Sequence, residues 1–157
     1  MKKLFLLTIV VATLVSCGSP KTVLESKKVI KGYWVLNSIT YSESGKFNVT
    51  MLGDASKECF EGSQWRFIPN NNTGVYTIDR AGCDVGDRHF IFTIQEIDRT
   101  TGYYDFLLKP TNERKKSESN HGFRMQLSQL SETDMQWQQH LTVEGKPFTI
   151  YMNFIKN

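Results

Sequence analysis

The sequence predicts an all-β domain, an eight-stranded antiparallel up-and-down β-barrel, with a β-sandwich as the structural alternative. Alanine occurs only three times in 157 residues, against ten Phe, six Tyr and three Trp. Aromatic residues suit pleated sheets, whereas helical bundles rely on strong helix formers. Apolar and polar residues alternate with a period of two from residue 32 onwards, as in strands with one buried face. Closing such strands into a barrel leaves no exposed sheet edge.

Residues 1–16 are predicted to be a signal peptide. Lys2 and Lys3 give a positive start, and residues 4–15 follow without a charge. A helix of that length spans about 18 Å, short of the roughly 30 Å hydrocarbon core of a bilayer. The segment is therefore typical of an export signal rather than of a membrane-spanning helix.

The signal ends in Leu14-Val15-Ser16-Cys17, which resembles the lipobox of bacterial lipoproteins. The resemblance implies a diacylglyceryl thioether on Cys17, cleavage before this residue and acylation of the new amino group. Several acyl chains anchor a protein stably, whereas a single chain gives only marginal binding. The alternative is an ordinary secretory signal followed by a chance cysteine.

Removal of the signal changes the charge of the chain. The full sequence has 19 basic and 16 acidic residues, and the signal takes two lysines with it, so the mature chain carries only +1. A nucleic-acid partner is not predicted, because it would need a concentrated basic face. Residues 17–31 are polar and are predicted to tether the anchor to the domain, with a short helical turn within residues 23–30.

The predicted location is the outer membrane of a Gram-negative bacterium, facing the periplasm. Surface-exported lipoproteins of some Gram-negative groups resemble one another in an acidic run just after the lipidated cysteine. This chain lacks such a run, since its first acid after Cys17 is Glu25. The membrane, reached through the lipid on Cys17, is the predicted partner, and the protein is expected to be a monomer.

The barrel domain is predicted to cover residues 32–157. Its first strand spans residues 32–42. Residues 64–69 and 73–79 flank Asn70-Asn71-Asn72, a turn signal that predicts a hairpin. The remaining strands are predicted at residues 88–97, 102–109, 122–130, 134–143 and 146–155. Each of these carries large apolar residues at every second position, so one face of each strand is expected to point into the core.

This domain resembles the lipocalin-like domains of bacterial lipoproteins. Gly32-Tyr33-Trp34 looks like the Gly-X-Trp signature of lipocalins, and Thr133-Asp134 falls where lipocalins carry a Thr-Asp-aromatic turn, with Met135 replacing the aromatic residue. The resemblance implies that Gly32 and Trp34 close one end of the barrel. Lipocalins also stack an Arg from the end of the last strand on this Trp, and here only Lys156 stands in that region.

Cys59 and Cys83 are predicted to form a disulfide. An exported protein lies in an oxidising compartment, and Cys17 is committed to the lipid. If Ile68 pairs with Thr73 across the hairpin turn, the same register brings Cys59 to within one residue of a position opposite Cys83. That placement suits the Cα separation of roughly 5.5 Å that a disulfide needs. The alternative is a pair of buried free thiols.

The resemblance to lipocalins predicts that the barrel binds or carries a small apolar ligand in the cell envelope. An eight-stranded barrel has room for packed side chains or for one small ligand. With Trp34 pointing inward as the resemblance to lipocalins implies, the predicted pocket walls are Trp34, Phe92, Phe106, Met125 and Trp137. Their flat aromatic and flexible Met side chains suit an apolar ligand. The alternative is an envelope structural or protein-interaction module whose barrel is filled by its own side chains.

About 20 residues separate the first two predicted strands and include Phe47, Met51, Leu52 and Phe60. Loops of that length are uncommon and often functional. In lipocalins this connection is a lid over the open end of the barrel. The alternative is a structural plug made of an irregular strand and a turn.

No enzyme, cofactor or metal site is predicted. Asp84, Asp87 and His89 lie close together, but Asp-x-x-Asp flanked by Gly is ordinary turn chemistry. The sequence contains no Gly-x-Ser-x-Gly, His-Glu-x-x-His or phosphate-loop motif. A metal site is not expected, because His89, His121 and His140 lie on different elements and no Cys-x-x-Cys pair occurs.

Overall fold

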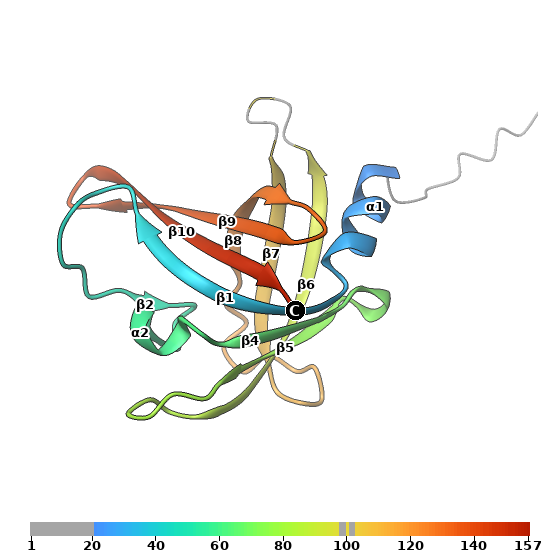
Figure 1. Ribbon diagram of the computed structural model, residues 1–157, viewed down its shortest axis with the longest axis horizontal. Coiled ribbons are helices and arrows are strands. Elements are labelled where there is room, and N and C mark those ends of the chain that lie inside the picture. Colours follow the sequence, from blue (N-terminus) through green and yellow to red (C-terminus); the bar gives the residue numbers. More distant parts are fainter. Residues whose placement is uncertain (1–20, 98–99, 101–102) are drawn as a thin grey trace, which may run out of the picture.

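The structure, a computed structural model, describes residues 21–97, 100 and 103–157. Eight strands form a closed antiparallel barrel in the order β1-β10-β9-β8-β7-β6-β5-β4, and β4 pairs again with β1 (Figure 1). The strands are β1 (Gly32–Tyr41), β4 (Gln64–Ile68), β5 (Thr73–Ile78), β6 (Gly86–Ile97), β7 (Tyr104–Thr111), β8 (Phe123–Leu130), β9 (Asp134–Val143) and β10 (Lys146–Lys156). The predicted up-and-down barrel is confirmed, with every strand boundary within two residues, and the sandwich alternative is wrong.

Smaller elements flank the barrel. They are α1 (Lys21–Ile30), β2 (Thr50–Met51), β3 (Ala55–Ser56), α2 (Lys57–Phe60) and the 3₁₀ turn η1 (Pro69–Asn71). The described part of the predicted tether is therefore a packed helix, whereas the sequence suggested only a short turn. Val23, Ser26 and Ile30 form its buried stripe, and such packing stabilises a helix that would be marginal alone. None of the described helices is long and apolar enough to cross a membrane.

The barrel has two different ends. The covered end holds the start of β1, the end of β10 and the β4–β5 and β8–β9 turns, and α1 packs there against β6, β8 and η1. The mouth holds residues 42–63, 79–85 and 112–122, together with the short β9–β10 turn. In Figure 1, α1 and the β9–β10 turn lie on opposite sides of the molecule.

Aromatic rings dominate the core. Trp65 stacks on Tyr76 with ring centroids 4.5 Å apart, and its edge meets the Trp137 ring at 5.4 Å. Gly74 makes room for this packing, since a Cβ there would lie 2.2 Å from Cζ of Phe90. The period-two alternation of the sequence therefore directs these large side chains inward, where they pack against one another.

The β4–β5 hairpin has the predicted register, with Ile68 opposite Thr73. Pro69 begins η1, and Asn72 closes the turn at φ 55°. Asn tolerates this left-handed conformation better than most residues, which explains why the Asn-rich stretch forms the turn.

The outer part of the β9–β10 hairpin extends past the rest of the barrel. Its last pairing with β1 joins Tyr41 to Ile150, and its last pairing with β8 joins Gln138 to Gln126, so residues 139–143 have only β10 as a neighbouring strand. Leu141 and Val143, which continue the inward-facing alternation, are consequently 37% and 45% exposed. Strand periodicity identified their face correctly but could not show that the face leaves the core at this point.

Candidate functional site

The predicted pocket walls all lie in the core. Trp34, Phe92, Phe106, Met125 and Trp137 are each at most 2% exposed. Phe106 stacks on Phe92 at 5.3 Å and on Trp137 at 4.5 Å, and Met125 is its partner across the β7–β8 ladder. The structure thus brings four of the five residues together and places Trp34 separately, next to α1. The three aromatic rings pack against one another in the barrel centre.

Trp34 joins the helix, the first strand and the last strand at the covered end. Its indole Nε1 donates a hydrogen bond to the carbonyl of Ile30 at 2.8 Å. The Lys156 ammonium lies 5.2 Å from the Trp34 ring centroid and donates to the carbonyl of Val29 at 2.6 Å. Lys156 therefore makes the cation–π contact for which the lipocalin pattern uses an Arg. Gly32 allows the sharp change of direction between helix and strand, with φ at 119°.

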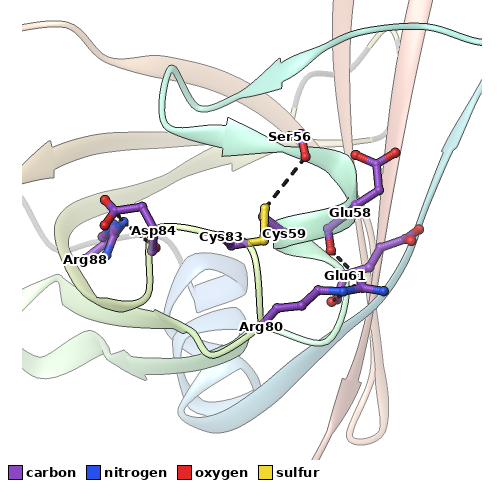
Figure 2. The surroundings of a disulfide bond; sticks show 8 residues. All are labelled: Ser56, Glu58, Cys59, Glu61, Arg80, Cys83, Asp84 and Arg88. Atoms are coloured by element: carbon purple, nitrogen blue, oxygen red, sulfur yellow. Dashed lines mark hydrogen bonds and ion pairs between the residues drawn. A yellow bond between two sulfur atoms is a disulfide. The ribbon is translucent and has the colours of Figure 1, made fainter.

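Cys59 and Cys83 form the predicted disulfide, with their Cα atoms 5.7 Å apart. The bond joins α2 to the connection between β5 and β6, near the mouth (Figure 2). In the same place the Arg80 guanidinium donates to the backbone carbonyls of Glu58 and Glu61. The β5–β6 connection is thus tied to α2 by one covalent bond and by charge-assisted hydrogen bonds.

The long connection at residues 42–63 is packed against the barrel. Met51, Leu52 and Phe60 are buried, and the Phe60 ring lies 5.3 Å from that of Tyr76. The Glu61 carboxylate accepts a hydrogen bond from the backbone N–H of Ile39 at 2.8 Å. This packing corresponds to the plug interpretation of the segment more closely than to a freely moving lid.

A hollow of about 880 Å³ opens at the mouth, between the β2–β3 turn and the β7–β8 loop. Its lining includes Leu52, Asp54, Tyr76, Arg88, His121 and Phe123. Leu52 is buried although its φ is 50°, an uncommon conformation for a bulky residue. Such conformations persist only where the surrounding structure holds them, and they cluster at binding sites.

A polar network forms one wall of the hollow. The buried hydroxyl of Tyr76 donates to the Asp54 carboxylate at 2.8 Å, and Arg88 Nε lies 3.3 Å from the same carboxylate oxygen. Arg88 also binds the carboxylate of Asp84 at 2.7 Å. Burial, followed by the Asp54 charge, raises the pKa of Tyr76 well above its usual value. The hydroxyl is therefore a fixed donor that fastens the β2–β3 turn to β5.

No motif in the sequence marks this site. Asp87 and His89, whose spacing is that of ordinary turn chemistry, do line the hollow, but Asp54, Tyr76 and Phe123 come from three other elements. The signal that could have pointed to the mouth was the length of the β1–β4 connection. No local motif marks residues that only the barrel closure brings together.

A second hollow, of about 660 Å³, runs along the outer face of β6, β7 and β8. Ile91, Leu107 and Lys109 line it, and they alternate with the inward-pointing Phe92 and Leu108. The sheet separates this groove from the barrel interior. Within residues 21–97, 100 and 103–157, no three His, Cys, Asp or Glu side chains converge to hold a metal ion.

Among solved structures, the chain is similar to a lipocalin-like protein from Bacteroides uniformis, with a TM-score of 0.51 and 9% identity over 82% of this chain and 99% of that one. A bovine odorant-binding protein in complex with a selenium-containing odorant matches with a TM-score of 0.43 and 15% identity, over 82% and 73% of the two chains. No family model and no curated protein matches the chain. The first likeness shows that the domain has a lipocalin-like fold, as the Gly-X-Trp resemblance predicted.

Proposed function

We propose that the protein is a lipid-anchored envelope protein that binds a small molecule in the hollow at the mouth of its barrel. The observation that carries this proposal is the hollow itself. Its volume of about 880 Å³ falls within the roughly 300–1,000 Å³ of small-molecule sites. Its walls come from the ends of four barrel strands and from the loops that these strands hold in place, and loops on a rigid scaffold are where proteins commonly place binding residues.

The lining favours an amphipathic ligand over a wholly apolar one. Leu52, Pro110 and Phe123 offer apolar surface, whereas His89 and His121 offer ring nitrogens. A ligand with a hydrophobic part against the first group and a polar part near the two imidazoles would match both kinds of surface. Binding without catalysis is the proposed role.

Ligand binding can be tested on a chain whose first 17 residues are exchanged for a cleavable signal without a lipobox, which keeps every described residue. Native mass spectrometry and solvent extraction after purification should reveal a bound small molecule at one per chain. Ser119→Trp should abolish this binding, because Ser119 lines the hollow. Ser44→Trp, at another exposed loop serine, is the matched control and should retain it.

A second candidate function is a structural or protein-interaction module with a filled barrel. The close ring packing of Phe92, Phe106 and Trp137 favours it. A purified protein without any bound molecule, whose Trp fluorescence is unaffected by fatty acids and other amphiphiles, would support this alternative and contradict ligand binding.

The anchor at Cys17 is the other part of the proposal, and it lies outside the described residues. The lipobox resemblance supports it, with residues 1–16 removed and the mature chain held in the outer membrane on the periplasmic side. Cells grown with labelled palmitate should incorporate the label into the wild-type protein and not into Cys17→Ala. Equal labelling of the two would contradict acylation at this residue.

A further inference from the structure

We propose that the outward face of α1 lies on the surface of a membrane that contains anionic phospholipid, so that the mouth of the barrel points away from the membrane. This inference rests on the proposed anchor at Cys17 and adds an interaction surface and an orientation to it. The occupant of the surface is the layer of lipid headgroups, recognised by charge.

The helix presents a defined face to this surface. Leu24, Lys28 and Lys31 follow one another at intervals of four and three residues, a spacing that places side chains in one row along a helix. Lys31 is the first residue after α1. All three are exposed, and Leu24 is 48% exposed despite its apolar side chain. The row lies away from the stripe of Val23, Ser26 and Ile30 that packs against the barrel.

The anchor keeps this face close to the lipid. Three residues lie between Cys17 and the start of α1 at Lys21, and the four Cα–Cα steps from Cys17 to Lys21 reach roughly 14 Å at most. The helix itself is only about 15 Å long. An acyl group on Cys17 would therefore hold all of α1 near the headgroups.

Helix α1 is fixed to the barrel by hydrogen bonds, so the two change orientation together. Trp34 Nε1 and Lys156 Nζ donate to its last carbonyls, those of Ile30 and Val29. Lys27 Nζ donates to the Asn72 side chain in the β4–β5 turn at 2.8 Å. These bonds connect the helix to β1, β10 and the hairpin turn, so the orientation of α1 sets the orientation of the barrel.

The distribution of charge along the chain indicates which end of the protein faces an anionic membrane. Residues 17–31 contain four lysines and one glutamate, whereas residues 32–157 contain 13 basic and 15 acidic residues. Residues 17–31 therefore carry a charge of +3 and the barrel a charge of −2. An anionic surface attracts the first and repels the second, and each lysine near such a surface contributes roughly a fivefold increase in binding.

The experiment measures reversible binding of the mature chain, residues 17–157, carrying one acyl chain attached chemically to the Cys17 thiol. A single chain binds membranes only marginally, so the contribution of α1 is measurable. Wild type, Lys28→Gln/Lys31→Gln and the control Lys46→Gln/Lys146→Gln are sedimented with phosphatidylcholine vesicles, with and without phosphatidylglycerol. The control removes the same charge from exposed lysines at the mouth.

On vesicles with phosphatidylglycerol, the helix variant should bind roughly 25-fold more weakly than wild type, and the control should bind like wild type. On phosphatidylcholine alone the three proteins should bind equally. Equal binding of the helix variant and wild type to the anionic vesicles, or an equal loss in the control, would overturn the proposal. Because the acyl chain is added chemically, this result does not depend on acylation in cells, which palmitate labelling tests separately.

Discussion

The two ends of the barrel are built differently, although the same eight strands form both. At the covered end Trp34 is fully buried, and its ring nitrogen and the Lys156 ammonium satisfy the last carbonyls of α1. At the mouth, longer connections are held by the Cys59–Cys83 disulfide and by hydrogen bonds around Tyr76, and a hollow remains open.

The covered end contributes mainly to the stability of the barrel, whereas the mouth provides the space proposed for binding. The covered end depends on a large buried ring, whose removal leaves both a cavity and an unpaired carbonyl. The mouth depends on individual bonds between loops, which can be removed one at a time while the barrel persists. Substitutions at the two ends should therefore differ in size and in how far their effects spread.

The largest effect is expected for Trp34→Ala. Deleting a fully buried aromatic ring costs about 4 kcal/mol of the free energy of unfolding, and here the Ile30 carbonyl also loses its donor. Denaturant unfolding of the disulfide-bonded protein measures the loss. Val85→Ala at the mouth, where Val85 is 57% exposed, is the control and should change stability by less than about 0.5 kcal/mol. A similar loss of unfolding free energy in both variants would contradict the proposed difference in stability between the two ends.

The next largest effect is expected for the double substitution Cys59→Ser/Cys83→Ser. The two cysteines are 24 positions apart in the sequence, and a protein that loses a disulfide closing a loop of this size loses about 3 kcal/mol of stability. Hydrogen exchange should also speed up at the amides of residues 50–62 and leave those around Trp34 slow under native conditions. Faster exchange at both ends alike would show that the mouth does not open on its own.

Tyr76→Phe should cost about 2 kcal/mol at neutral pH, because the Asp54 carboxylate loses a buried hydrogen-bond donor. The raised pKa of Tyr76 also predicts a pH dependence. Above about pH 10, the usual tyrosine value, the unfolded chain releases this proton before the folded protein does, so wild-type stability should fall as pH rises. The fall should be less steep in Tyr76→Phe. Parallel alkaline curves for the two proteins would contradict the assignment.

The smallest effect concerns the contact that replaces the lipocalin arginine. Lys156→Met should lose about 1 kcal/mol, since it removes both the cation over the Trp34 ring and the donor to the Val29 carbonyl. Lys156→Arg should stay close to wild type, because a guanidinium can make the same ring contact. Denaturant midpoints compare the two, and an equal loss in both would show that the ring contact contributes nothing.

Much of the fold could be predicted because its signals are local. Alternation along each strand identified the inward faces, and the Asn-rich turn set the hairpin register from which the Cys59–Cys83 bond followed. The helix over Lys21–Ile30 was underestimated, since its stability comes from packing on strands far away in the sequence. The hollow could not be predicted for a related reason. Asp54, Tyr76, Arg88 and Phe123 meet there only because closure of the barrel brings the β2–β3 turn together with β5, β6 and β8.

The aromatic-rich, alanine-poor composition and the period-two pattern by themselves determined a small antiparallel barrel with two cysteines in bonding reach. The concentration of positive charge in residues 17–31 is likewise evident from the sequence alone, because it depends only on where the lysines and the glutamate stand in the chain. Only the tertiary structure decided that the aromatic side chains pack tightly in the centre and that open space lies at the mouth. Closure of the sheet brings alternate residues of all eight strands into one volume, and the sizes of those side chains, together with the packed loops, decide where space remains.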